Sequence, residues 1–134
     1  MSLRNIKKFV FEVVPQPLNS FWVINDLNSL QHPVKRIFFS KSKEKELRGN
    51  HAHMHCWQTL VCLEGKIIVS FDDGKEKTSI SLESEGEAVT MSPRIWSSQE
   101  YDKDSYLMVL CSHVYDSEDY VRDNQEFLKK VVET

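Results

Sequence analysis

Short apolar runs recur along most of the chain, with turn-forming residues between them. Gly65 and the sequence Asp72-Asp73-Gly74 mark two of these turns, and Pro15 and Pro17 separate the first two runs. Strands at intervals of about 8–12 residues indicate an all-β sandwich or barrel rather than alternating strands and helices. The polar stretch 41–47 is predicted to be a loop. The predicted strands cover residues 9–14, 21–24, 34–39, 58–63, 67–71, 79–82, 88–91 and 106–111.

The C-terminal tail follows a different pattern, because its apolar residues return at helical spacing over residues 117–133. Ser117 is expected to cap the N-terminus, and Lys129 and Lys130 suit the last turn. We therefore expect an amphipathic helix that packs on the barrel, with a partner-binding helix as the alternative. The face of this helix would carry Tyr120, Val121, Asn124, Phe127, Leu128 and Val131.

Composition narrows the class of protein. The 134 residues fit one domain, 1–134, and a net charge of −3 gives no sign of a nucleic-acid partner. No apolar stretch approaches the roughly 18 residues of a membrane span. The three cysteines lack the spacing of a disulfide framework or a zinc knuckle, and Cys62 and Cys111 are expected to be core residues. These features predict a cytoplasmic protein without a membrane segment.

Three histidines alternate with other residues just before an apolar run. In a strand, His51, His53 and, if the strand continues, His55 share one face, and Ala52 points to the other. Inside a small barrel, such imidazoles form a polar site in an apolar cavity. A set of surface histidines at a polar edge is the simpler alternative.

Metal binding is one interpretation of this cluster. His51-Ala52-His53 is followed after four residues by Gln58 and after six more by Gly65. This spacing resembles the first metal-binding motif of cupins, except that Gln58 replaces a glutamate. The second cupin motif usually supplies another histidine after a proline, and the segment 93–98 has none. A neutral amide is a poor ligand, so we predict no metal unless His55 or His113 substitutes.

Acid–base catalysis is the other interpretation. Neutral imidazole both accepts and donates protons near physiological pH, so a pair on one face can move a proton between neighbouring carbons. Arg48 lies just before the pair and offers a fixed positive charge for an enediolate or a phosphate. A salt bridge between Arg48 and a nearby glutamate is an equally good interpretation.

The segment RGNHAHMHCWQTLVCLEGKIIVSFDDG closely resembles the signature of dTDP-sugar 3,4-ketoisomerases, the WxcM-like group of the cupin superfamily. Residues 34–39, 91–96 and 115–128 also resemble segments of this family, so the resemblance covers about residues 33–130. It implies a cupin-type jelly-roll barrel and a cofactor-independent conversion of a dTDP-4-keto-6-deoxyhexose to its 3-keto isomer. The product would feed the biosynthesis of 3-amino-3,6-dideoxy sugars.

The resemblance also implies roles for individual residues. By motif match, His51 and His53 would transfer protons and Arg48 would hold the substrate. The remaining residues expected to bind the dTDP-sugar are Arg36, Gln58, Arg94, Trp96, Ser97 and His55. A homodimer is implied as well, often with exchanged N-terminal strands.

Two positions depart from the family pattern. The family has an arginine-containing segment near the N-terminus where this chain reads Pro17-Leu18-Asn19-Ser20-Phe21-Trp22, and commonly a histidine where this chain has Ser97. The first departure leaves the product configuration and the exact substrate open. The second leaves open the rate, the specificity and whether the chain is an isomerase. The alternatives are a non-catalytic cupin that binds a nucleotide sugar, a nucleotide-sugar epimerase, and a metal-dependent dioxygenase, the last opposed by Gln58 and Ser97.

Overall fold

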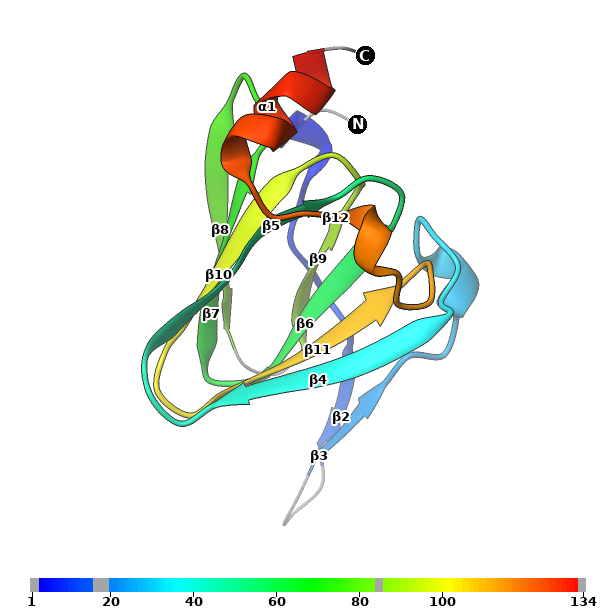
Figure 1. The fold of residues 1–134 in the computed structure, drawn as a ribbon. Coiled ribbons are helices and arrows are strands. Elements are labelled where there is room, and N and C mark those ends of the chain that lie inside the picture. The colour runs from blue at the N-terminus through cyan, green and yellow to red at the C-terminus, as the bar shows by residue number, and fades with distance from the viewer. Residues whose placement is uncertain (1–2, 16–19, 84–85, 133–134) are drawn as a thin grey trace.

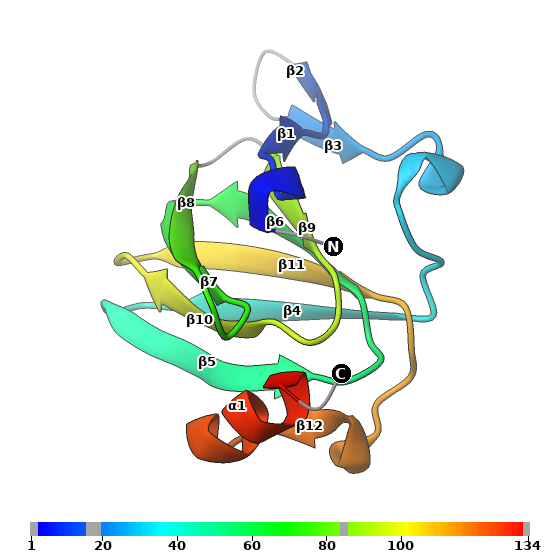
Figure 2. The same cartoon turned by 90° about the horizontal axis from the view of Figure 1, so that it is seen from above.

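Two antiparallel five-stranded sheets face each other and form a jelly-roll barrel, as the sequence predicts (Figures 1 and 2). The structure is a computed structural model and describes residues 3–15, 20–83 and 86–132. The strands are β1 (Phe9–Val10), β2 (Glu12–Pro15), β3 (Ser20–Val23), β4 (Arg36–Ser42), β5 (Glu46–His53), β6 (Gln58–Glu64), β7 (Lys66–Asp72), β8 (Lys77–Glu83), β9 (Glu87–Met91), β10 (Trp96–Tyr101), β11 (Ser105–Cys111) and β12 (Tyr120–Val121).

The first sheet has the order β1-β9-β6-β11-β4, and the second has the order β12-β5-β10-β7-β8. The β2–β3 hairpin forms a separate pair that projects away from the barrel (Figure 1). Within the part of the chain that the structure describes, 3₁₀ helices lie before β1, at Leu3–Asn5, and in two connections, at Leu27–Ser29 and Ser117–Asp119. Among the described residues, no helix is long and apolar enough to cross a membrane.

The main core lies between the two sheets. Because side chains alternate between the faces of a strand, Leu60 and Cys62 of β6 point inward with Leu107 and Val109 of β11. They meet the inward residues of β7, including Phe71, which is only 1% exposed. Cys62 and Cys111 are fully buried in this core, which confirms their predicted packing role.

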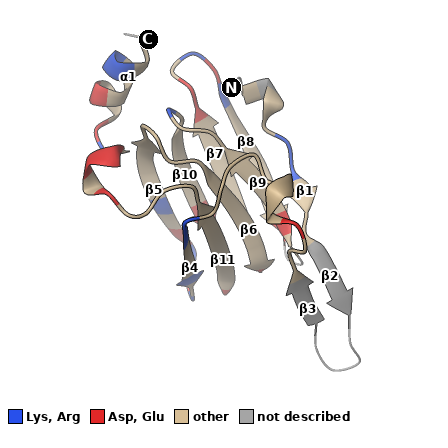
Figure 3. Cartoon of the chain, turned by 90° about the vertical axis from the view of Figure 1, so that its right-hand side faces the viewer, with Lys and Arg blue, Asp and Glu red and all other residues tan. Residues whose placement is uncertain are grey.

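The C-terminal helix covers the outer face of the second sheet. It is α1 (Asn124–Val132), and it buries Phe127 completely against Ala52 and Val121. Its acidic residue lies in the first turn and its lysines in the last, as the helix dipole favours (Figure 3).

The predicted start of this helix, however, is wrong. Residues 117–119 form a 3₁₀ turn with Asp116 as the N-cap, and β12 follows before the helix begins. The reason is tertiary pairing, because Tyr120 pairs with His53 and Val121 with Ala52 at the edge of the second sheet. This pairing outweighs the local helical spacing.

Two further expectations about strands need correction. The segment 41–47 was expected to be a loop, but β4 continues to Ser42 and β5 begins at Glu46, so only a tight turn remains. β10 was not expected as a strand, because its sequence WSSQEY has little apolar alternation. Its polar residues are divided between the two faces. Ser97 and Gln99 share the inward face and hydrogen-bond each other, whereas Ser98 bonds Ser70 and Glu100 pairs with Lys45 on the outer face. Residues 17–19 belong to the N-terminal segment that differs from the family pattern, and they lie outside the described residues.

Candidate active site

A bulge in β5 brings Arg48 and the two histidines to the same face. Gly49 has φ +90° and Asn50 has φ 58°, and the pairing with β10 shifts by one residue at this point. In a regular strand, Arg48 and His51 would face opposite sides because they are three residues apart. A Cβ atom on Gly49 would lie 3.1 Å from the carbonyl oxygen of Ser97, so glycine is needed here.

His51 and His53 form an aromatic cluster with Tyr120. The two imidazole centroids are 5.0 Å apart, and the Tyr120 ring lies 5.0 Å from His51 and 4.3 Å from His53. Tyr120 takes this position because β12 pairs directly with the end of β5. The predicted shared face of His51 and His53 is thus confirmed. His55 lies beyond the end of β5 and is exposed.

Asp119 orients His53. His53 is 4% exposed, and its Nδ1 donates to the Asp119 carboxylate over 3.0 Å. The same carboxylate accepts backbone N–H groups from His55 at 2.6 Å and Cys56 at 3.3 Å. With its proton on Nδ1, His53 carries a lone pair on Nε2, a buried atom without a partner among the described residues.

Burial keeps both imidazoles neutral. For His51, burial is the largest cause, and electrostatic repulsion from His53 and Arg122 acts in the same direction; together they lower its pKa to about 4. Burial also lowers the pKa of His53, although the hydrogen bond to Asp119 opposes this effect. For Asp119, burial acts to raise the pKa, but the hydrogen bonds from His53, His55 and Cys56 prevail and lower it. Near neutral pH the site therefore holds two neutral imidazoles and one carboxylate.

Arg36 and Gln58 lie beside this cluster on the inner face of the first sheet. The Arg36 guanidinium donates to the sulfur of Cys111 at 3.5 Å and hydrogen-bonds Tyr120. It also lies 5.6 Å from the ring centre of Tyr115. The Gln58 amide donates to the same sulfur at 3.6 Å. The structure thus places two of the predicted substrate-binding residues near the histidines.

Ser97 lies directly opposite His51 in the β10–β5 pair and is 3% exposed. Its hydroxyl accepts a hydrogen bond from the Gln99 side chain at 3.1 Å. Paired residues of antiparallel strands project to the same face, so the Ser97 side chain lies on the same side as the His51 imidazole. The buried Nδ1 of His51 is without a partner among the described residues. Ser97 is therefore part of the site.

Arg48 shares the inner face but is held by the protein. Its guanidinium donates to the Ser40 hydroxyl, to the Lys41 carbonyl at 3.1 Å and to Glu46 at 2.9 Å. It also lies 4.9 Å from the ring centre of Tyr101. β4 and β5 are neighbouring strands of different sheets, so Arg48 joins the two sheets. The alternative of a salt bridge with a nearby glutamate is confirmed.

The side chains of Arg94 and Trp96 contact α1 and not the two imidazoles, although the Arg94 backbone N–H donates to the His53 carbonyl. Arg94 donates to the Lys130 carbonyl at 2.6 Å, near the end of α1. The Trp96 ring packs against Phe127 with centroids 5.8 Å apart, on the outer face of the second sheet. The strand register explains the position of Trp96: it pairs with Ala52, whose side chain points to the outer face of the sheet.

Three site residues were missed from the sequence: Asp119, Tyr120 and Arg122. The tail was interpreted as one helix, which placed Asp119 in a solvent-exposed first turn. Arg122 lies 4.6 Å from the Tyr120 ring centre and adds a second positive charge near His51. No local pattern gives these contacts, since 66 residues separate His53 from Asp119.

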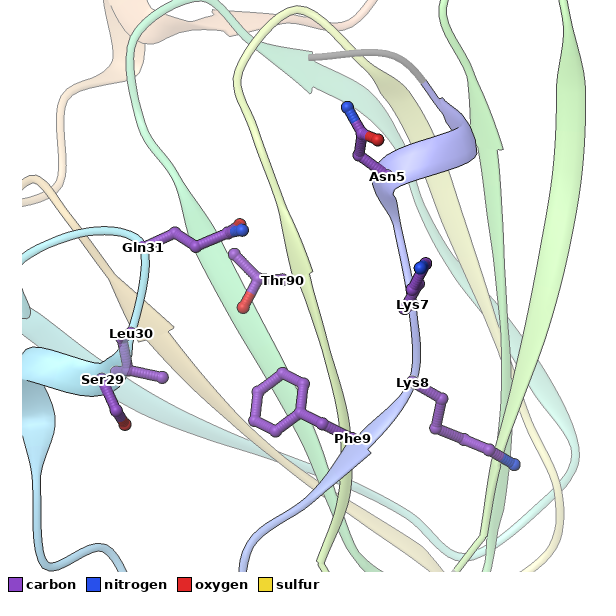
Figure 4. Close-up of a pocket in the computed structure, with 8 residues that line it drawn as sticks. All are labelled: Asn5, Lys7, Lys8, Phe9, Ser29, Leu30, Gln31 and Thr90. Carbon is purple, nitrogen blue, oxygen red and sulfur yellow. The ribbon is translucent and has the colours of Figure 1, made fainter.

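One hollow lies apart from the site. A cavity of about 320 Å³ is bordered by the N-terminal segment, the 29–31 turn and Thr90 of β9 (Figure 4). None of the predicted site residues lines it. A second cavity of about 330 Å³ is lined by His55, His113, Val114, Asp116 and Asp119, and so reaches the site at Asp119.

Comparison with known proteins gives a consistent result. Residues 4–132 match the family described as FdtA: WxcM-like, C-terminal. The TDP-4-oxo-6-deoxy-alpha-D-glucose-3,4-oxoisomerase of Aneurinibacillus thermoaerophilus is 32% identical over 123 residues, which cover 90% of this chain and 88% of that protein.

Two solved structures extend the comparison. A 3,4-ketoisomerase from Helicobacter canadensis superposes with a TM-score of 0.85 and 26% identity, over 96% of this chain and 98% of that one. The sugar 3,4-ketoisomerase QdtA from Thermoanaerobacterium thermosaccharolyticum, in complex with TDP, gives 0.86 and 22% identity, over 98% of both chains. At 22% identity the second match supports the fold alone.

Proposed function

The chain belongs to the FdtA (WxcM-like, C-terminal) family, and on that premise we propose that it is a sugar 3,4-ketoisomerase acting on a TDP-4-keto-6-deoxyhexose. The observation that carries the proposal is the neutral His51–His53 pair, with His53 oriented by Asp119. The relative from Aneurinibacillus is named for this reaction.

The reaction needs only proton transfers. The C4 ketone acidifies the proton on C3, and a base that removes it leaves an enediolate across C3 and C4. The C4 oxygen is then protonated to give a cis-enediol. Loss of the proton on the C3 oxygen and delivery of a proton to C4 complete the 3-keto isomer. Atoms and electrons balance without an external oxidant or cofactor.

The two histidines divide this work. Each has a buried nitrogen without a partner among the described residues, Nδ1 of His51 and Nε2 of His53, and either can accept a proton only when neutral. Asp119 makes His53 the better carrier of positive charge, because its carboxylate stabilises an imidazolium on that ring. His51 remains a neutral partner that exchanges protons with the substrate oxygens.

Positive charge around the cluster suits the anionic part of the substrate. Arg36 hydrogen-bonds Tyr120 and the Arg122 guanidinium lies over the Tyr120 ring, and we assign both to the diphosphate. Gln58, Ser97 and His55 are assigned as further substrate contacts. Arg48 positions β5 rather than contacting substrate, since three protein acceptors occupy its guanidinium. Arg94 and Trp96 are assigned a structural role, because their side chains contact α1 on the outer face of the second sheet.

A homodimer is the oligomeric state that we propose. Ile37 and Phe39 alternate on the outer face of β4 and are 53% and 56% exposed. Phe39 lies beside Met108, which lines an apolar hollow of about 220 Å³ on the same sheet face. An exposed apolar face of this kind suits a second copy of the chain. The N-terminal strands next to this face are candidates for exchange between subunits.

The cell compartment and the fate of the product complete the proposal. Free thiols at Cys56, Cys62 and Cys111 suit the reducing cytoplasm. A 3-keto sugar is a substrate for transamination, so an enzyme that installs a 3-amino group would consume the product.

Activity on the nucleotide sugar tests the function directly. We expect the purified protein to convert TDP-4-keto-6-deoxyglucose to a 3-keto species that NMR resolves. His51→Asn and His53→Asn should each lower the rate by about 10²-fold or more, the range of general acid–base catalysis. Saturable binding of the substrate without any conversion would instead identify a nucleotide-sugar-binding cupin. Full activity in either variant would contradict the assigned role of that histidine.

A further inference from the structure

A cluster of three potential metal ligands surrounds Nδ1 of His53, on the side of the ring away from its free Nε2. His53, Cys56 and Asp119 each offer a ligand atom, and these atoms all lie within 4.8 Å of one another. All three residues are buried, with exposed fractions of 4%, 3% and 8%. The reaction proposed above uses neither the Cys56 thiol nor a metal.

The spacing suits a tetrahedral cation. Zinc binds nitrogen and oxygen at about 2.0–2.2 Å and sulfur at about 2.3 Å, so ligand atoms around it lie roughly 3.3–3.8 Å apart. Nδ1 of His53 and the Asp119 carboxylate are already 3.0 Å apart. Because all ligand atoms lie within 4.8 Å of one another, a contraction of at most roughly 1–1.5 Å at the Cys56 sulfur completes a three-ligand shell. Imidazole, thiolate and carboxylate together form a donor set that zinc prefers.

The backbone already holds this cluster together. The N–H groups of His55 and Cys56 donate to Asp119, so the carboxylate and the cysteine are tied to one turn. His53 is fixed at the end of β5, where its carbonyl accepts from the backbone of Arg94 at 2.6 Å. The Cys111 sulfur lies outside this set of ligand atoms and accepts hydrogen bonds from Arg36 and Gln58.

We propose that His53, Cys56 and Asp119 form an inhibitory site for Zn²⁺ or a similar thiophilic divalent cation. On binding, the cation takes Nδ1 of His53, and the Cys56 thiol releases its proton to solvent. The neutral imidazole keeps one proton, which moves from Nδ1 to Nε2. The lone pair on Nε2 is thereby lost, and with it the base. This site differs from the cupin motif, since Gln58 and Ser97 take no part.

Cobalt substitution gives a readout that does not depend on activity. We would titrate the reduced, metal-stripped protein with Co²⁺ and record the thiolate-to-cobalt charge-transfer band in the near ultraviolet. The wild type should show the band at one equivalent per chain, and added Zn²⁺ should remove it. Cys56→Ser should abolish it, whereas Cys62→Ser should retain it, since Cys62 is equally buried but hydrogen-bonds the Glu64 and Gly65 carbonyls.

Three results would overturn the site: no band in the wild type, a full band in Cys56→Ser, or loss of the band in Cys62→Ser while that variant keeps the wild-type melting temperature. Equal melting curves for the two serine variants guard against a folding defect.

The second part of the test measures inhibition by zinc, and it rests on the proposed isomerase activity. Zn²⁺ should inhibit the wild type and Cys62→Ser, and a chelator should restore both, while Cys56→Ser should stay active with zinc present. If zinc binds but all three proteins remain equally active, the inhibitory role is wrong although the site stands. If the metal-free wild type is itself inactive, the proposed function fails and the cobalt result is unaffected.

Discussion

At the scale of single residues, the orientation of His53 depends on Asp119. Replacing Asp119 by Asn keeps the shape but removes the charge that stabilises a protonated imidazole. We expect kcat to fall by about 10²–10⁴-fold, as for an aspartate that orients a catalytic histidine elsewhere. A merely structural role would lower the melting temperature in proportion to activity. Steady-state kinetics and thermal melts of the same sample separate the two effects.

The lowered pKa of His51 makes a prediction about stability and pH. Its pKa is about 4 in the folded protein and about 6.5 when unfolded, so between these values the unfolded chain binds more protons. The contribution of His51 to stability is therefore complete above pH 6.5 and is lost as pH falls towards 4. Urea unfolding at pH 7, 5.5 and 4.5 should show this loss in the wild type and a weaker one in His51→Asn. Parallel pH profiles for the two proteins would contradict the lowered pKa.

The sequence indicated part of the site at this scale. The period of two placed His51 and His53 on one face, and the structure confirms it. Asp119 could not be found in the same way, because its contact with His53 arises from the pairing of β12 with β5. Arg48 was expected to hold the substrate, and that role stays a prediction; the structure shows its guanidinium bonded to Glu46 and Ser40, the contacts on which we base its proposed positioning role.

At the scale of elements, the β5 bulge sets the direction of the site. Gly49→Ala would force a side chain into a φ of +90° and against the backbone of β10, so we expect a loss of roughly 1–3 kcal/mol in stability and a greater loss of activity. Gly74→Ala is the matched control, with φ +94° in the β7–β8 turn. That variant should lose stability but keep its kcat. Equal kcat values in the two variants would show that the bulge does not position the histidines.

Strand boundaries were predictable where a continuous apolar run marks the strand and not where polar residues enter the interior. β6 and β11 are such runs, and each lies within one residue of its predicted bounds. β10 escaped prediction because Ser97 and Gln99 occupy inward positions that usually hold apolar side chains. The start of α1 was misplaced because helical spacing in the sequence gives no information on the pairing of Tyr120–Val121 with the edge of the second sheet.

At the scale of the whole molecule, the exposed face of the first sheet carries the proposed dimer. Phe39→Glu would place a charge in the middle of that interface, so we expect it to give a monomer by light scattering while the wild type is a dimer. Leu47→Glu is the control, since Leu47 is 57% exposed on the other sheet. A wild-type monomer, or a dimer that survives Phe39→Glu, would refute this interface.

The central claim is that His51 and His53 move a proton between neighbouring carbons of a TDP-4-keto sugar. The most direct measurement is conversion of TDP-4-keto-6-deoxyglucose in deuterated water, followed by NMR. We predict a 3-keto product that carries deuterium at C4, formed by the wild type and strongly slowed in His51→Asn and His53→Asn. Unchanged substrate with no deuterium at C3 or C4, in the presence of folded wild-type protein, would contradict the claim.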